Sequence, residues 1–266
     1  MAVTEAVGQA TINGLAYVGE LAKLVGRAGY SAFIAPLRGQ QVRLGRAVHQ
    51  AMAVGVEALP IISLITFFVG TILALQSAYE LRKFGALEYV ASAVALSMTR
   101  ELGPLMTAIV VIGRSGSAFA AEIGTMKVNE EIDALETMAL DPTQFLVMPK
   151  FLAMLLMMPC LTTWADFMGV LGGALFGVLD AGFTFGSYIR ATLDSLLLHD
   201  LTTGLIKSIM FGMVITAVGC QEGFSTGAGS EEVGRSTTSA VVKSIFLVVM
   251  VDLIFTALFY FTAPAS

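Results

Sequence analysis

Charged residues are scarce in this chain of 266 residues. Only 13% of the residues are charged and 56% are hydrophobic, with a mean hydropathy of +0.81. Soluble domains carry about 25% charged residues, so the composition excludes an ordinary water-soluble protein and points to a membrane. The formal net charge of −5 is spread over many segments, and this distribution predicts no nucleic-acid partner.

Histidine, cysteine and phosphate-binding motifs are also scarce. His49 and His199 are the only histidines and fall near opposite membrane faces, which argues against a histidine-based metal site or a Ser-His-Asp triad. Cys160 and Cys220 lie in apolar stretches, where thiols behave as small hydrophobic groups. The motif G-x-x-x-x-G-K-[ST] is absent, so we expect no cofactor on this chain and place any ATP hydrolysis on another polypeptide.

Long apolar runs dominate the remainder of the sequence. Because a bilayer core of about 30 Å requires about 20 apolar residues in a helix, the runs predict five membrane spans. They cover about residues 54–79, 87–113, 147–179, 201–220 and 240–261. The chain is therefore predicted to be an all-α polytopic membrane protein with its two termini on opposite sides.

The distribution of basic residues predicts the orientation of the chain. Basic residues gather on the cytoplasmic side of membrane proteins. With a cytoplasmic N-terminus and a periplasmic C-terminus, the inner segments hold Lys23, Arg27, Arg38, Arg43, Arg46, Arg114, Lys127, Lys150, Arg235 and Lys243. The outer segments then hold only Arg82, Lys83 and Arg190.

The chain is expected to form a single domain, 1–266, in which the first 50 residues differ from residues 51–266. Residues 5–35 show apolar positions at helical spacing without a 20-residue apolar run, which predicts a helix lying in the membrane interface. Pro36 is expected to end this helix. The basic stretch 38–46 suits anionic headgroups, although an ordinary solvated linker explains it equally well.

Small residues form two clusters, GRSGSAFAAEIG at 113–124 and GVLGGALFG at 169–177. In lipid, helices associate where small residues allow their backbones to approach closely. The clusters therefore predict tight helix contacts, either within the bundle or in a dimer.

The stretch EIGTMKVNEEIDALETMALDP, residues 122–142, is unusually charged for this chain, with six acids and one base. Val128, Ile132, Leu135 and Met138 or Ala139 are spaced as one face of a helix. The pattern predicts a short amphipathic helix at the cytoplasmic surface, in which Lys127 and Glu131 form an i,i+4 pair. On periodicity alone, this helix is best explained as a cover for the bundle.

This stretch, preceded by GRSGSAFAAE, resembles the signature of the MlaE (YrbE) family of ABC-transporter permeases, and the similarity extends over most of the chain. Glu131 stands where the family commonly has Gln. The resemblance implies a homodimer, a cytoplasmic ABC ATPase that binds ATP and Mg²⁺, and a periplasmic Mce-domain partner. It further implies a permease in a bacterial inner membrane that moves phospholipid between the inner and outer membranes and maintains outer-membrane lipid asymmetry.

The same resemblance implies that residues 122–142 form a coupling helix, which docks on the ATPase and transmits its closure to the spans. The residues that would make this contact are Glu122, Thr125, Lys127, Glu130, Glu131 and Asp133, with Asp141 and Pro142 fixing the exit turn.

Four ionisable residues fall inside the predicted spans, where each costs at least about 2.5 kcal/mol without a partner. They are Arg100, Glu101, Lys207 and Asp252. The two bases and two acids are expected to neutralise one another, either as structural ion bridges or while a base meets a lipid phosphate. Gly103 and Pro104 are expected to kink or break the second span nearby.

An apolar face at the outer end of the first span is a further candidate for lipid contact. Leu73, Ser77, Leu81 and Phe84 share one helical face and are nominated as the wall of a lipid pocket. Ordinary packing within the bundle is the alternative interpretation.

Two other functions remain open on the residues. An integral-membrane lipid enzyme would use Glu101 or Asp252 as an acid or base, but it would also need a nucleophile or metal nearby. An ion-coupled carrier would use Arg100, Glu101, Lys207 and Asp252 as a relay.

Overall fold

The computed structural model describes residues 2–34, 44–179 and 182–262 of the chain, and it contains no strand within these ranges. Five of its helical stretches are long and apolar enough to cross a membrane: Gly45–Lys83, Leu87–Val128, Thr143–Leu179, Leu198–Phe224 and Ser230–Thr262. The predicted all-α fold with five spans is confirmed. Helices suit this environment because they satisfy their backbone hydrogen bonds internally where no water is available.

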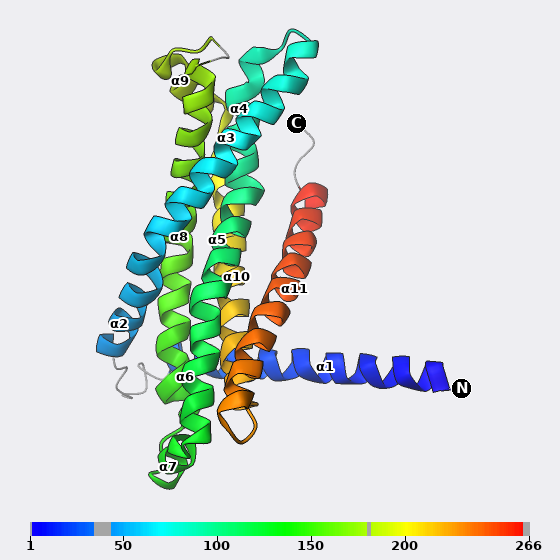
Figure 1. The fold of residues 1–266 in the computed structure, drawn as a ribbon, viewed down its shortest axis with the longest axis vertical. Coiled ribbons are helices and arrows are strands. Elements are labelled where there is room, and N and C mark those ends of the chain that lie inside the picture. Colours follow the sequence, from blue (N-terminus) through cyan, green and yellow to red (C-terminus); the bar gives the residue numbers. More distant parts are fainter. Residues whose placement is uncertain (1, 35–43, 180–181, 263–266) are drawn as a thin grey trace.

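The helices follow one another with only short connections (Figure 1). Their bounds are α1 Ala2–Gly29, α2 Leu44–Gly55, α3 Leu59–Lys83, α4 Val90–Ser97, α5 Gly103–Val111, α6 Ser117–Val128, α7 Glu131–Thr137, α8 Met148–Leu179, α9 Phe185–Ser195, α10 Leu198–Phe224 and α11 Ser230–Thr262. Single 3-10 turns lie at Val56–Ala58 and Leu87–Tyr89. π-helical turns lie at Tyr30–Ile34, Met98–Leu102, Ile112–Gly116 and Thr143–Val147.

Helix α1 lies across the end of the bundle, roughly perpendicular to the spans (Figure 1). Leu21 is buried against Ala217 and Val218 of α10, while Leu15 is 68% exposed. This arrangement is that of an interfacial helix, as its sequence predicts. The expected end at Pro36, and residues 38–43 of the basic stretch, lie outside the described residues.

Helix α8 forms the centre of the bundle and packs against α2, α3, α5 and α10. Its glycines allow this packing: a Cβ on Gly172 would lie 2.0 Å from the carbonyl oxygen of Phe67 in α3. A Cβ on Gly70 of α3 would lie 1.9 Å from the carbonyl oxygen of Gly169. The close contacts predicted from the glycine cluster at 169–177 therefore exist within one chain.

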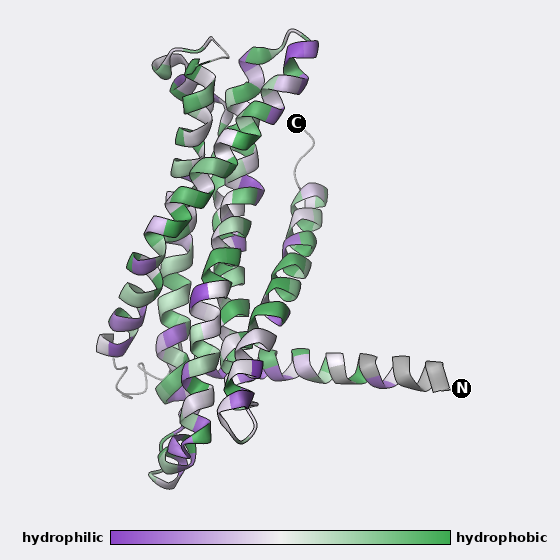
Figure 2. Cartoon of the chain, viewed as in Figure 1, coloured by the Kyte–Doolittle hydropathy of each residue, from purple (hydrophilic) through white to green (hydrophobic). Residues whose placement is uncertain are grey.

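Of the two outcomes expected at Gly103 and Pro104, a kink or a break, the break does not occur. Helix runs without a gap from Val90 to Val128, because a π-helical turn at Met98–Leu102 precedes Pro104. Proline lacks an N–H and crowds the preceding turn, and a widened turn accommodates both effects. Hydrophilic residues gather at the two ends of the bundle and on α7, with a few on α1 and within the spans (Figure 2).

Helix α9 is a short helix that the apolar runs did not predict. Thr184 caps its start: the Thr184 hydroxyl accepts from the Ser187 N–H, and the Ser187 hydroxyl accepts from the Thr184 N–H. Tyr188 is fully buried beside Ala91 and Ala174, and this burial raises the pKa of its hydroxyl to about 12. The helix therefore covers the ends of α4 and α8 opposite α7.

Candidate functional site

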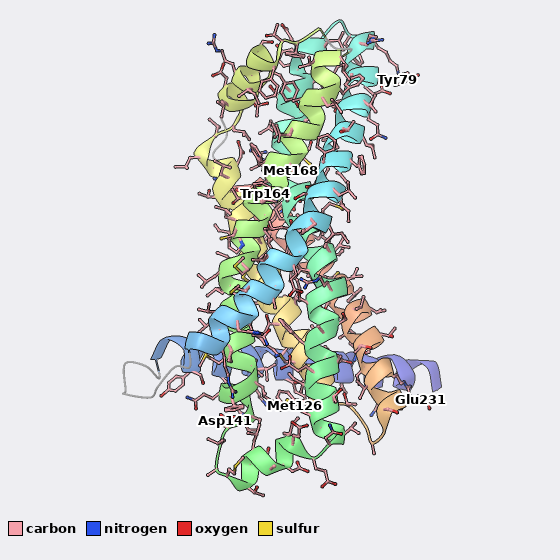
Figure 3. The ribbon with its side chains drawn as sticks, turned by 60° about the vertical axis from the view of Figure 1, so that its left-hand side comes forward. Tyr79, Met126, Asp141, Trp164, Met168 and Glu231 are labelled. Carbon is pink, nitrogen blue, oxygen red and sulfur yellow. The ribbon has the colours of Figure 1, made fainter. Side chains whose placement is uncertain are left out.

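Helix α7 lies beyond the end of the bundle (Figure 3). In the chain it connects the span that ends with α6 to the span that contains α8. It is shorter than the sequence pattern suggested, because Val128 ends α6 and Met138 lies beyond Thr137. Ile132 and Leu135 are each 7% exposed and pack against Leu146 and Val147. The apolar stripe of the helix thus anchors it to the base of α8.

Two residues in the left-handed backbone conformation bracket α7. Glu130 has φ 60° and Ala139 has φ 56°, a conformation that costs non-glycine residues roughly 1–2 kcal/mol. The turn at Glu130 also separates Lys127 from Glu131, so the predicted ion pair between them does not form. Instead, the Lys127 ammonium donates to the backbone carbonyl of Phe224, and Glu131 accepts from the Asn129 side chain at 3.3 Å.

The residues nominated for partner contact lie largely on the surface of the hairpin formed by α6, α7 and α8. All are exposed except Pro142, which is half-buried: Glu122, Thr125, Lys127, Glu130, Glu131, Asp133 and Asp141. Asp141 accepts from the Thr143 N–H at 2.8 Å and so closes the exit turn. Glu122 differs from the others because it points to Lys150 of α8, at 2.7 Å.

A charge cluster lies inside the membrane between α10, α11 and the π-helical turn of the second span. Lys207 of α10, with its side chain 1% exposed, contacts Glu101 at 2.6 Å and Asp252 at 3.0 Å. The Lys207 ammonium also donates to the Thr256 hydroxyl at 2.8 Å. The Thr256 hydroxyl in turn donates to Glu101 at 3.1 Å. One buried cation therefore holds two acids from two other helices.

Arg100 does not join this cluster. The two bases and two acids therefore do not neutralise one another as a single group, as the sequence suggested. The Nε and Nη2 atoms of Arg100 both lie 2.5 Å from Asp200 at the start of α10. Adjacent residues on a helix project about 100° apart, so Arg100 and Glu101 reach different partners. Asp200, 1% exposed, also accepts from the Leu197 N–H at 2.9 Å.

Two partners in these ion pairs and hydrogen bonds were missed from the sequence. Asp200 follows His199 at a span end, and its ability to cap the helix at Leu197 was the available signal. Thr256 stands four residues after Asp252, on the same face of α11. A hydroxyl one turn from an intramembrane acid is therefore a usable sign of a polar cluster.

The nominated apolar face at the end of α3 is divided in the structure. Leu73 and Leu81 are partly buried against a cluster that contains Val90 and Val94. Phe84 lies just past the end of α3 and is 80% exposed, while Ser77 is half-buried. An apolar pocket of about 370 Å³ lies elsewhere on the bundle, lined by Phe67, Leu171, Ala174, Leu175, Val178, Leu179 and Phe185.

Comparison with known proteins places the chain in a family. The profile of the family described as Permease MlaE matches residues 47–258. A probable ABC transporter permease protein of Rickettsia felis is 39% identical over 97% of this chain and 98% of its own length. The intermembrane phospholipid transport system permease protein MlaE of Haemophilus influenzae is 36% identical, over 90% of this chain and 92% of its own length.

A plant protein shares the same region. The chloroplastic protein TRIGALACTOSYLDIACYLGLYCEROL 1 of Arabidopsis thaliana is 34% identical over 80% of this chain and 61% of its own length. The family profile covers most of the chain, including all of α3 to α10, and the bacterial relatives match it nearly end to end. The chain therefore belongs to the MlaE family of permeases.

Proposed function

We propose that this chain is the membrane-spanning subunit of an ABC transporter that moves phospholipid between the inner and outer membranes of a bacterium and so maintains outer-membrane lipid asymmetry. The transported class is supported by the name of the Haemophilus influenzae relative, a phospholipid transport permease. The subunit acts as a homodimer, with a cytoplasmic ATPase that carries ATP and Mg²⁺ and a periplasmic Mce-domain protein. It performs no chemistry on the lipid itself.

The α6–α7–α8 hairpin is the observation that carries this proposal. Helix α7 is joined directly to two spans, its apolar side is anchored against Leu146 and Val147, and its acidic side is exposed. A force applied to such a short rigid element moves both spans, because packed helices transmit displacement as units. Glu130, Glu131 and Asp133 supply the charged surface that the ATPase grips.

The mid-membrane charges belong to the lipid pathway in this proposal. Lys207 holds Glu101 and Asp252 together at bilayer depth, and ionisable groups at this depth commonly mark a substrate route. Movement of α11 relative to α10 would open this cluster to a lipid phosphate. Arg100, whose side chain is 48% exposed beside Asp200, and the apolar face of Leu73, Ser77, Leu81 and Phe84 lie along the same proposed route.

Exposed apolar surface supports the proposed homodimer. In the last span, only 11% of the most apolar stretch is buried. In the first span, the buried share of the corresponding stretch is 28%. Both spans therefore offer a long face to lipid or to a second copy. In the proposed orientation the N-terminus and α7 are cytoplasmic and the C-terminus is periplasmic.

Charge reversal on α7 tests the proposal. Glu130→Lys combined with Glu131→Lys should abolish copurification of the ATPase while the permease still folds and inserts. The matched control is Glu80→Lys with Glu88→Lys, which reverses two exposed acids at the other end of the bundle and should leave copurification intact. Unchanged ATPase recovery with the α7 variant would contradict the assignment.

Orientation is tested separately by labelling single cysteines. In a background with Cys160→Ala and Cys220→Ala, a cysteine at Glu136 should react with a membrane-impermeant maleimide only after the cells are opened. A cysteine at Lys83 should react in cells whose outer membrane alone is permeabilised. The reverse pattern would place α7 outside the cytoplasm and overturn the proposal.

A further inference from the structure

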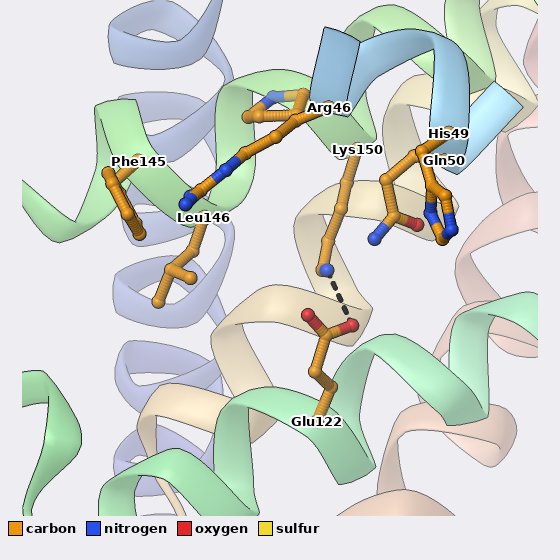
Figure 4. A pocket seen from close by; sticks show the side chains of 8 residues that line it. Arg46, His49, Gln50, Glu122, Phe145, Leu146 and Lys150 are labelled. Carbon is orange, nitrogen blue, oxygen red and sulfur yellow. Dashed lines mark hydrogen bonds and ion pairs between the residues drawn. The ribbon is translucent and has the colours of Figure 1, made fainter. Parts of the chain in front are cut away.

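A polar pocket of about 180 Å³ opens at the end of the bundle that carries α7 (Figure 4). It is lined by Arg46, His49 and Gln50 of α2, Glu122 of α6 and Lys150 of α8, and the Lys150 side chain extends toward Glu122. The pocket is larger than a single water requires. Three helices that are distant in sequence thus bring two cations and two further hydrogen-bonding side chains to one opening.

Lys150 is buried to an unusual degree for a lysine, with its side chain only 2% exposed. Its ammonium donates to Glu122 at 2.7 Å and lies 5.2 Å from the ring centre of Phe119. An ammonium has three donors, and within the described part of the chain Glu122 is the acceptor that the structure supplies. A buried charge with donors to spare favours a second anionic partner.

Arg46 is held in place by stacking rather than by a carboxylate. Its guanidinium carbon lies 3.9 Å from the ring centre of Phe145, and among the described residues no acid forms an ion pair with it. Stacking covers the flat face of the guanidinium and leaves its N–H edge able to bind a phosphate in a bidentate manner. This geometry is pre-organised for an oxyanion.

In the adjoining cavity, the chain itself supplies the partners of a cation. That cavity shares His49, Gln50 and Glu122 with the pocket and contains Arg114. The Arg114 guanidinium pairs with Glu57 and donates to the Ala53 carbonyl at 2.8 Å. Its charge is balanced within the chain, whereas the pocket lined by Arg46 and Lys150 contains one acid, Glu122, which pairs with Lys150.

We propose that this pocket binds an anionic phosphate group, as presented by a phospholipid headgroup at this face of the membrane, between Arg46 and Lys150. The two fixed cations and one fixed anion leave one positive charge in the pocket, which a singly charged phosphodiester neutralises. His49 and Gln50 contribute further N–H donors. The proposal concerns binding at the bundle end, so it stands whether or not the chain transports phospholipid.

The pocket is also connected to α7. Glu122 precedes α7 in the chain and Lys150 follows it, so their ion pair ties the two stems of the hairpin. Leu146 lines the pocket and packs in one cluster with Ile132 and Leu135 of α7. A phosphate that draws Lys150 away from Glu122 therefore loosens this tie, and headgroup occupancy acts on the hairpin.

Lipid titration of the purified full-length chain tests the site. Native mass spectrometry in detergent would compare dioleoyl phosphatidylglycerol, whose headgroup is anionic, with zwitterionic dioleoyl phosphatidylcholine. We expect phosphatidylglycerol to bind about tenfold more tightly, and Arg46→Gln or Lys150→Gln to remove most of that preference. Arg235→Gln is the matched control, because Arg235 is an exposed base near the start of α11, and α11 starts at the same end of the bundle (Figure 1).

Glu122→Gln distinguishes loss of the binding site from misfolding of the variant protein. It removes the competing anion, so it should strengthen phosphatidylglycerol binding several-fold, the opposite direction to Lys150→Gln. The proposal is overturned if Glu122→Gln weakens binding, if both pocket variants bind as wild type does, or if Arg235→Gln loses as much as they do.

Sodium phosphate distinguishes the two sources of the anion. If millimolar phosphate displaces phosphatidylglycerol from the wild type, and direct phosphate binding is lost in Arg46→Gln, the site also accepts free phosphate. If phosphate does not compete while the lipid preference holds, the headgroup of a lipid is the specific occupant. Hydrogen exchange of residues 143–150 should change on lipid binding in the wild type but not in Arg46→Gln, which locates the effect.

Discussion

Helices α8 and α11 have nearly the same length, 32 and 33 residues, but they are held in the bundle by different interactions. Helix α8 is buried along 61% of its most apolar stretch, with Gly169, Gly172 and Gly173 in close contact with its neighbours. Helix α11 is buried along only 11% of its most apolar stretch. Its charged and hydroxyl side chains attach it to α10 at two places.

The two polar attachments of α11 lie about three helical turns apart. Toward its start, Lys243 pairs with Glu222 of α10 at 2.8 Å, and the Ser239 hydroxyl donates to the same carboxylate at 2.6 Å. Further along, Asp252 and Thr256 contact Lys207 of α10. Hydrophobicity provides no drive between helices in lipid, so close packing and polar contacts are the alternatives. Helix α8 depends mainly on close packing, although its Lys150 also pairs with Glu122. Helix α11 depends more on polar contacts, although its Val248 is buried in the core.

The largest effect is expected from filling a glycine contact of α8. Gly172→Leu would place a Cβ 2.0 Å from the Phe67 carbonyl oxygen, and backbone cannot yield as a flexible side chain does. We expect loss of monodisperse protein in size-exclusion chromatography. Gly234→Leu is the control on α11, where a Cβ meets nothing within 4 Å; a normal yield of Gly172→Leu would show that the close packing is dispensable.

The second prediction removes the deeper polar attachment of α11. Lys207→Met leaves Glu101 and Asp252 without their cation, and breaking a buried ion pair costs about 3–5 kcal/mol. We expect the lower end, because the Glu101 side chain is 38% exposed. Thermal unfolding in lipid nanodiscs measures the loss. Adding Glu101→Gln and Asp252→Asn should restore most of the stability, and a single variant as stable as the wild type would refute the attachment.

The third prediction concerns the attachment near the start of α11. Glu222→Gln removes the charge that Lys243 pairs with and weakens the hydrogen bond from the Tyr17 hydroxyl at 2.8 Å. We expect a loss of about 1–3 kcal/mol and faster proteolysis of α1. Glu232→Gln is the control, since its pair with Arg235 is exposed and 3.7 Å long and should contribute little.

The fourth prediction is a pH dependence at the same attachment. Burial, the hydrogen bond to Glu222 and the negative charges of Glu222 and Glu20 raise the pKa of Tyr17 well above its usual value of about 10. The folded state therefore favours the protonated hydroxyl. Its contribution is complete below pH of about 10 and is lost as the pH rises toward the folded pKa. At alkaline pH we expect α1 to detach from the bundle, which is measured as faster proteolysis of α1. Tyr17→Phe should remove the part of this pH dependence that comes from Tyr17.

The smallest effect is expected on the lipid-facing side of α11. Phe246 is 63% exposed, so Phe246→Ala exchanges contact with lipid for contact with lipid and should change monomer stability by less than about 0.5 kcal/mol. Unfolding in nanodiscs at high lipid-to-protein ratio checks this. A large loss would show that α11 depends on apolar packing after all, and the contrast with α8 would fail.

The sequence predicted the outline of the site better than its contacts. Helical spacing indicated an amphipathic helix around Ile132 and Leu135, and both residues are the buried ones. The ends of α7 were misjudged, because nothing in the spacing reveals that Glu130 adopts a left-handed conformation. The partner of Arg100 was also missed, because a residue near Asp200 in space lies 100 positions away in the chain.

Hydropathy alone determined that this chain has five spans, an interfacial first helix and an all-α fold, because the bilayer demands a fixed length of apolar helix with internal hydrogen bonds. Tertiary structure decided which span occupies the centre and which acid meets which base. The first and last spans are the most apolar and also the least buried, but hydropathy does not show which helices contact one another. Burial and ion pairing depend on where glycine permits approach and on how each helix is rotated toward its neighbours.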